Sequence, residues 1–347
     1  MKKIISVFAL IAALVALLAV CVSAVDVYEA FEKETFEHEG TTLPYRIYVP
    51  EDFDSAKKYP LVLFLHGAGE RGDDNDAQLK NAVQVLFDRE DQLIHQAIVV
   101  APQCPADNQW VDTPWADGNY SVAEVPESDE LAATVALVLE VADKYSCDPA
   151  RFYVMGLSMG GFGAWDLLMR HSDMFAAGIP ICGGADPAMA EIFVKTPVFT
   201  FHGTADSSVP YEGTHEMVSE IEDLGSRVVN FISYNNDGHG IWDKASREDG
   251  LMEWLFEQRL EIASVDTEPV DTQPVDTAEA TDEAVADTTP ATPDTPAVTD
   301  EQVSDGTDTD NSIDGKGGLP VGAIIAIASA VVVIAVITIV VKLKEKK

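Results

Sequence analysis

Residues 151–161 read Arg-Phe-Tyr-Val-Met-Gly-Leu-Ser-Met-Gly-Gly, and this stretch decides the fold. An apolar run typical of a buried strand ends at Gly156, a serine stands between two glycines, and helix-compatible residues follow at once. A serine at the apex of such a turn takes a strained backbone conformation, so the residues two positions away must be small. Gly156 and Gly160 meet that requirement. The pattern predicts a nucleophile elbow with Ser158 as the nucleophile.

Further apolar runs predict a sheet around this strand. Leu61–Leu65 and Ala97–Val100 are apolar on both faces, as parallel strands covered by helices should be. Other strands are predicted at 31–36, 43–49, 176–181, 197–201 and 228–234, and helices at 77–87, 128–145, 161–170, 212–224 and 244–259. Strand and helix alternate, which predicts an α/β fold with a mostly parallel central sheet and helices on both faces. Functional groups should gather at the carboxyl ends of the strands.

Two polar residues follow predicted strands where a catalytic triad needs them. An acid and a histidine should come after the serine in that order, each just beyond a strand. Asp206 follows the strand that ends at 201, and His239 follows the strand that ends at 234. In this interpretation Ser158 attacks an acyl carbonyl, His239 is the base, and Asp206 orients and stabilises its imidazole. Asp237 is a competitor for the acid, although it lies on the histidine's own loop.

Four motifs carry a resemblance to a known superfamily. They read HGAGERG from His66, GLSMGG from Gly156, HGTADSSVP from His202 and DGHGIW from Asp237. Together they resemble the α/β-hydrolase superfamily, in particular the secreted serine esterases and predicted peptidases related to polyhydroxybutyrate depolymerases and feruloyl or acetylxylan esterases. The resemblance covers about 31–262 and implies an α/β-hydrolase fold that cleaves carboxylic esters through an acyl-enzyme.

An oxyanion hole and a substrate site are expected around the serine. The elbow supplies the backbone N–H of Met159, and the resemblance implies Ala68 as the second donor, with Gly69 close behind. Trp110, Trp115 and Trp242 are candidates to contact substrate, the alternative being that the first two fill space beneath a loop. His202 is interpreted as structural. The cysteines contain no C-x-x-C pair, so neither a metal site nor a disulfide framework is indicated, and no cofactor is expected.

The two ends of the chain do not read as globular sequence. Residues 1–24 have the pattern of a signal peptide cleaved after Ala24, with a lipoprotein site at Cys21 as the alternative. An apolar run at 319–341, of bilayer-spanning length, precedes the basic tail 342–347. The acidic Thr/Pro/Asp-rich stretch 263–318 predicts a disordered stalk. This organisation places a catalytic domain at 25–262 outside the cell, on a single membrane-spanning anchor.

Charge narrows the class of partner. The net charge is −37, and most of it lies in the predicted domain, which argues against nucleic acid and anionic lipid. The sequence therefore predicts a surface-anchored serine hydrolase of small or oligomeric esters, such as acyl groups on carbohydrate. A peptidase of the prolyl-oligopeptidase type is the alternative with the same triad. A non-catalytic surface binding module is the alternative of another class.

Overall fold

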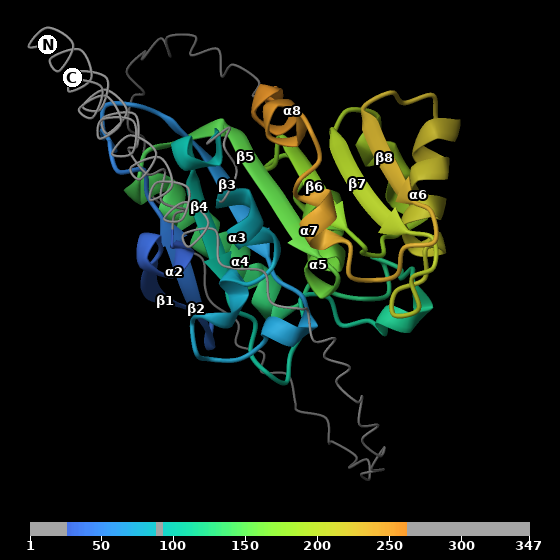
Figure 1. Cartoon of the computed structure of the whole chain (residues 1–347), viewed down its shortest axis with the longest axis horizontal. Coiled ribbons are helices and arrows are strands. Elements are labelled where there is room, and N and C mark those ends of the chain that lie inside the picture. The colour runs from blue at the N-terminus through green and yellow to red at the C-terminus, as the bar shows by residue number, and fades with distance from the viewer. Residues whose placement is uncertain (1–25, 88–92, 262–347) are drawn as a thin grey trace, which may run out of the picture. The chain divides into compact units, whose positions relative to one another are not determined.

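The computed structural model describes residues 26–87 and 93–261, which form a sheet of eight strands with helices on both faces (Figure 1). The strands are β1 Glu32–His38, β2 Thr41–Tyr48, β3 Tyr59–Leu65, β4 Ile98–Pro102, β5 Cys147–Leu157, β6 Ala177–Ile181, β7 Val198–Gly203 and β8 Val229–Tyr234. Their order is β1-β2-β4-β3-β5-β6-β7-β8. β2 pairs antiparallel with β1 and β4, and the other pairings are parallel. The strand before the serine, β5, therefore lies inside the sheet.

Helices cover the sheet in two layers, each with its own apolar core. They are α2 Val27–Ala30, α3 Ala82–Phe87, α4 Asp129–Lys144, α5 Met159–Arg170, α6 Glu212–Asp223, α7 Trp242–Ala245 and α8 Leu251–Glu257. In β3, Leu61, Leu63 and Leu65 join the core under α4, α5 and α6, whereas Val62 and Phe64 join the core under α2, α3, α7 and α8. Successive side chains of a strand point to opposite faces, so a central strand must be apolar throughout.

The antiparallel edge of the sheet begins with a tight hairpin. Residues Glu39 and Gly40 connect β1 to β2, and both have positive φ, 48° and 96°. Two such residues match the right-handed twist of the flanking strands, which explains the register in which His38 faces Thr41. Glu39 and Gly40 therefore form the turn of a two-residue hairpin.

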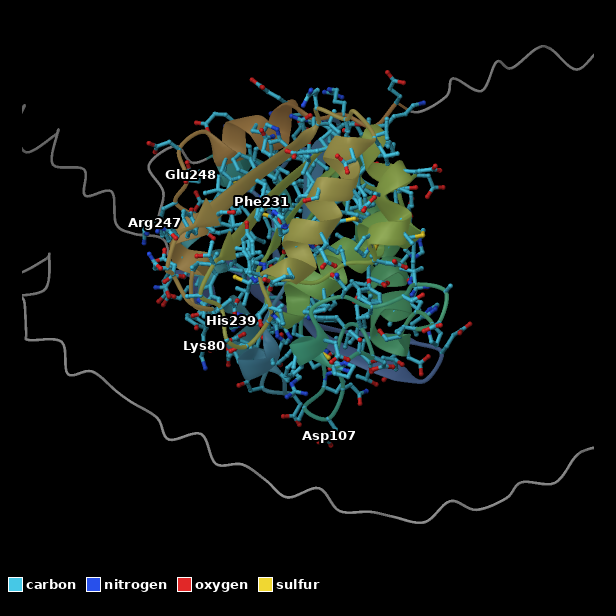
Figure 2. All side chains as sticks on the ribbon, turned by 90° about the vertical axis from the view of Figure 1, so that its right-hand side faces the viewer. Lys80, Asp107, Phe231, His239, Arg247 and Glu248 are labelled. Atoms are coloured by element: carbon cyan, nitrogen blue, oxygen red, sulfur yellow. The ribbon has the colours of Figure 1, made fainter. Side chains whose placement is uncertain are left out.

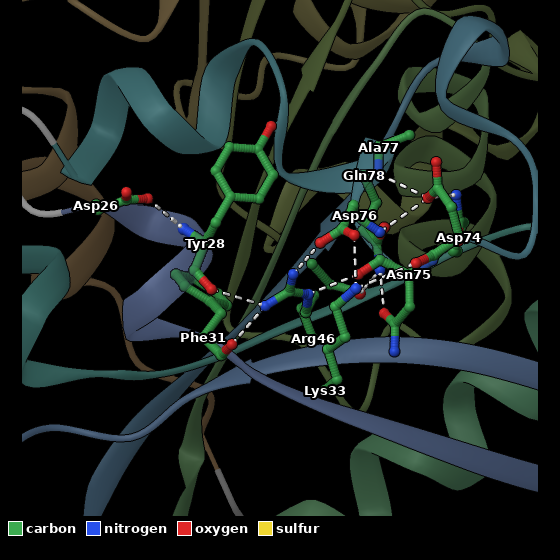
Figure 3. Close-up of polar contacts among 12 residues, drawn as sticks. Asp26, Tyr28, Phe31, Lys33, Arg46, Asp74, Asn75, Asp76, Ala77 and Gln78 are labelled. Carbon is green, nitrogen blue, oxygen red and sulfur yellow. Dashed lines mark hydrogen bonds and ion pairs between the residues drawn. The ribbon is translucent and has the colours of Figure 1, made fainter.

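A buried arginine ties the start of the described chain to this edge (Figure 3). Arg46 on β2 is 2% exposed, and its guanidinium donates to the main-chain carbonyls of Tyr28, Phe31 and Asn75 at 3.1, 2.6 and 2.6 Å. It also forms an ion pair with Asp76. A charge is tolerated inside a protein only when its hydrogen-bonding groups have partners, and this one has four. The segment around α2 is thereby fixed against β2.

Two predicted helices are each broken in the structure. The predicted helix 77–87 consists of a 3₁₀ turn, η2 Ala77–Leu79, and the helix α3, because Asn81 between them has a φ of 61°. The predicted helix 244–259 is wrong in the same way, because Gly250 has a φ of 76° and separates α7 from α8. A left-handed residue cannot continue a right-handed helix. The helices α4, α5 and α6 agree with prediction within two residues.

The predicted signal peptide 1–24, stalk 263–318, membrane span 319–341 and tail 342–347 lie outside the described residues. Within 26–87 and 93–261, no helix combines the length and the apolar character needed to cross a bilayer.

Candidate active site

The serine stands at the apex of a strained turn between β5 and α5. Ser158 has φ 54° and ψ −118°, a combination that a residue with a side chain rarely adopts. The turn is crowded on both sides. A Cβ on Gly156 would lie 2.0 Å from the carbonyl oxygen of Gly160, and a Cβ on Gly160 would lie 2.0 Å from that of Leu65. The two glycines are therefore required by backbone contacts, as the sequence predicted.

The structure brings the three predicted triad residues together. Ser158 Oγ lies 2.7 Å from His239 Nε2, and His239 Nδ1 lies 2.7 Å from Asp206 Oδ2. His239 comes from the loop after β8, where Figure 2 labels it, and Asp206 from the loop after β7. Because the carboxylate accepts the Nδ1 proton, Nε2 is free to accept the serine proton. Asp237 does not compete, since its carboxylate forms an ion pair with Lys244.

Asp206 is held as a carboxylate by a full set of donors. Burial alone would raise its pKa, but hydrogen bonds from His202, His239 and the Val209 N–H hold the pKa well below its usual value. Oδ1 accepts from the N–H groups of Ser208 and Val209 at 2.8 and 3.0 Å. The acid therefore stays charged at any pH at which the site works, and can stabilise the imidazolium that forms on His239.

The loop after β3 faces the serine. Ala68 and Gly69 line the same cavity as Ser158 and begin the 3₁₀ turn η1 Ala68–Glu70. Met159 is the first residue of α5, where N–H groups have no partner within the helix. The N–H groups of Met159 and Ala68 remain the predicted donors to an oxyanion.

His66 shapes this loop from within the core. Its Nε2 accepts from the Cys104 N–H at 2.9 Å, so its proton is on Nδ1, which donates to the Gly67 carbonyl at 2.6 Å. Burial lowers the pKa of His66 to about 4, so the ring is neutral at ordinary pH. Its own carbonyl accepts from Trp110 Nε1 at 3.0 Å. His66 thus fixes the oxyanion loop and takes no part in proton transfer.

A cavity of about 320 Å³ lies over the triad. Trp115 and Trp242 both line it, as predicted, and the Trp242 ring meets the His239 ring edge-on at 5.6 Å between centroids. Trp110 does not line it. Its side chain is 0% exposed and packs against His66, so the prediction that Trp110 contacts substrate is corrected to the space-filling alternative. A cavity of this size suits a small molecule or one end of a larger one.

Several residues around the site escaped sequence reasoning. Glu70 and Asn81 also line the cavity and are joined by a hydrogen bond of 2.9 Å, although Asn81 was predicted to lie within a helix. The buried thiol of Cys182 donates to the His239 carbonyl at 3.3 Å. Among the described residues, the potential metal ligands that converge are Cys182, Asp206 and His239, and the last two already serve the triad. No local sequence signal marks these contacts, because each joins separate loops.

Comparison with known proteins identifies the family. Residues 38–269 match the model of a family described as "Putative esterase". The chain belongs to this family. A probable carboxylesterase from Oryza sativa subsp. japonica is 26% identical in an alignment 208 residues long, which covers 55% of this chain and 85% of that protein. The solved structure of a thermostable esterase superposes with a TM-score of 0.60 at 34% identity, covering 67% of this chain and 64% of that one.

Another protein similar to this chain carries a substrate class in its name. A probable feruloyl esterase C from Aspergillus terreus (strain NIH 2624 / FGSC A1156) is 24% identical over 176 residues, 51% of this chain and 59% of that protein. The chain thus spans under two thirds of that relative and of the thermostable esterase. The resemblance to α/β-hydrolase esterases is confirmed, and the protein is a carboxylic-ester hydrolase of the α/β-hydrolase type.

Proposed function

We propose that this esterase removes aromatic acyl groups, of the feruloyl class, from carbohydrate at the outer cell surface. The observation that carries the proposal is the pair of indole walls, Trp115 and Trp242, in the cavity over Ser158. Flat aromatic groups bind between aromatic side chains in stacked or edge-to-face arrangements. The name of the Aspergillus relative supports the same acyl class. The acidic composition supports neutral substrates over anionic ones.

The proposed chemistry follows from the triad geometry. Ser158 Oγ gives its proton to His239 Nε2 as it attacks the ester carbonyl, and the oxyanion turns toward the N–H groups of Met159 and Ala68. His239 then protonates the leaving alcohol, and an acyl-serine remains. Water repeats the sequence with the same base and releases the acid. Asp206 keeps its charge throughout and holds the His239 ring in the tautomer that accepts at Nε2.

The proposed location rests on sequence alone. Residues 1–24 have the pattern of a signal peptide, and 319–341 with the lysine-rich 342–347 have that of a membrane span with a cytoplasmic tail. Fractionation of cells followed by protease treatment tests it. The catalytic domain should be lost from intact cells on treatment, and recovery of the full chain in the soluble cytoplasm would contradict the proposal.

The activity test compares substrates on the full-length chain. Methyl ferulate should be hydrolysed with a higher kcat/KM than p-nitrophenyl acetate, and Ser158→Ala should abolish both. Trp115→Ala should lower kcat/KM for methyl ferulate more than for the acetate, because only the aryl group stacks on the indole. An equal loss for both substrates contradicts the aromatic acyl site. Faster cleavage of an amide than of its ester favours a peptidase, and no fluorophosphonate labelling of Ser158 favours a binding module.

A further inference from the structure

A second histidine contacts the triad from the buried side. His202 is the residue before the last of β7, and its side chain is 0% exposed. Its Nε2 lies 3.3 Å from Asp206 Oδ2 and 3.1 Å from the Val209 carbonyl oxygen. Its Nδ1 lies 2.8 Å from Thr214 Oγ1. Oδ2 of Asp206 is therefore shared between His202 and His239, which approaches it at 2.7 Å.

The partners of His202 fix the number of protons on its ring. On the Nε2 side, the Asp206 carboxylate and the Val209 carbonyl can only accept, so Nε2 must carry a proton. On the other side, Thr214 Oγ1 has one proton, and it lies 2.7 Å from the Gly183 carbonyl oxygen, which also can only accept. Thr214 therefore donates its hydroxyl proton to the Gly183 carbonyl. Nδ1 of His202 must therefore donate to Thr214 and carry a proton as well.

We propose that His202 is a buried imidazolium, and that it acts as a positioning residue for the triad by holding Asp206 from behind. The pair formed by His202 and the Asp206 carboxylate has no net charge. When His239 takes the serine proton, its positive charge faces a carboxylate whose negative charge is already partly neutralised by His202. His202 thus limits how strongly Asp206 draws a proton onto His239, and keeps His239 available as a base under more acidic conditions.

An aromatic ring and a thiol are packed around this pair. The ring of Tyr211 meets the His202 ring edge-on at 5.8 Å between centroids, and Tyr211 in turn stacks on His215. The Cys182 thiol is kept neutral because burial and the Asp206 charge raise its pKa. The inference concerns the triad of the esterase and does not depend on which ester is its substrate.

The direct test is ¹⁵N NMR of the full-length protein labelled at histidine, with the His202 signals assigned through His202→Gln. Both ring nitrogens of His202 should show the chemical shifts of protonated nitrogen at pH 7. A shift typical of an unprotonated nitrogen at either position overturns the proposal. The measurement uses no substrate, so its result is independent of the feruloyl proposal.

Kinetics test the consequence with p-nitrophenyl acetate. In His202→Gln the acidic limb of the kcat/KM profile should move to higher pH, because a positive charge no longer opposes protonation of His239. If His202 had a merely structural role, His202→Gln would lower the plateau of the kcat/KM profile and leave its acidic limb at the same pH. That result would overturn the proposal. Thr214→Val, which cannot accept the Nδ1 proton, should move the limb in the same direction, and Thr214→Ser should restore it. These two variants keep the test decisive where His202→Gln does not fold.

Discussion

Replacing Gly160 by alanine tests whether backbone crowding, and not only chain flexibility, demands glycine at the elbow. In an isolated helix this change stabilises by about 1 kcal/mol, because alanine is the better helix former. Here the added Cβ would lie 2.0 Å from the Leu65 carbonyl oxygen and 2.5 Å from its carbon. Both are backbone atoms of a central strand, so no side-chain rotation relieves the contact. The start of α5 must move away from β3 instead.

The size of the effect follows from these opposing terms. Overpacking of this kind costs about 3 kcal/mol at the upper end of its usual range, which leaves about 2 kcal/mol of destabilisation after the helix gain. For a domain of this length that corresponds to a fall in Tm of about 4–8 °C. The same movement separates the Met159 and Ala68 donors, and a shift of about 1 Å in a catalytic geometry costs about 10²-fold in kcat.

Thermal unfolding and p-nitrophenyl acetate hydrolysis measure the two effects. Gly163→Ala is the matched control on the same helix, with the same gain in helix propensity. Its Cβ would lie 2.8 Å from Leu65 Cδ1 and 2.9 Å from Trp110 Cβ, which are side-chain atoms farther away than the backbone atoms that crowd Gly160, so its fall in Tm should be smaller. A Gly160→Ala protein with unchanged or higher Tm would falsify the reasoning. A larger fall in Tm for Gly163→Ala than for Gly160→Ala would contradict it as well.

Three further outcomes are expected. Asp206→Asn should lower kcat by about 10⁴-fold in ester hydrolysis with the fold retained by circular dichroism, because the amide favours the wrong His239 tautomer; a loss below tenfold would contradict the triad. Tyr120→Phe removes a 2.6 Å hydrogen bond to buried Asp166 and should cost about 1–3 kcal/mol in urea unfolding, and an unchanged midpoint would contradict it. The pair His171–Glu127, 2.7 Å apart, should stabilise by less than about 1 kcal/mol. The hydrogen bond raises the pKa of His171 above 6.5, so the stabilisation that comes from the charged histidine is lost as the pH rises above 6.5. The same hydrogen bond lowers the pKa of Glu127 below 4.5, so the stabilisation that comes from the carboxylate is lost as the pH falls below 4.5. Relative to Glu127→Gln, stability should therefore peak between about pH 4.5 and 6.5, and a difference that persists undiminished at pH 9 contradicts this.

Features set by neighbouring residues could be predicted from the sequence. The elbow around Ser158, the strand before it and the positions of Asp206 and His239 all follow from apolar runs and from what comes directly after them. The break at Gly250 could not be predicted with the same ease, because glycine is tolerated within a helix as well as at its end. Trp110 shows the other limit. A tryptophan in a loop can face a cavity or the core, and only the His66 carbonyl, 44 residues earlier in the chain, decides which.

The role proposed for His202 also could not be predicted from the sequence, because it depends on which hydrogen-bond donors and acceptors surround the ring. His202 reads as an ordinary strand-end histidine until Thr214 and Gly183, from two other parts of the chain, are seen beside it.

The arginine on β2 has a consequence for how this chain can vary in evolution. Arg46 grips the N-terminal segment through the main-chain oxygens of Tyr28 and Phe31, which every amino acid possesses. Substitutions of the Tyr28 side chain, which is 39% exposed, therefore leave these hydrogen bonds intact, whereas no other side chain can replace the forked guanidinium. Aligned relatives should show an invariant arginine and a variable residue at position 28. Methods that infer contacts from correlated substitutions cannot detect such an attachment. The acceptors are main-chain oxygens, so a substitution at their positions requires no compensating change at Arg46.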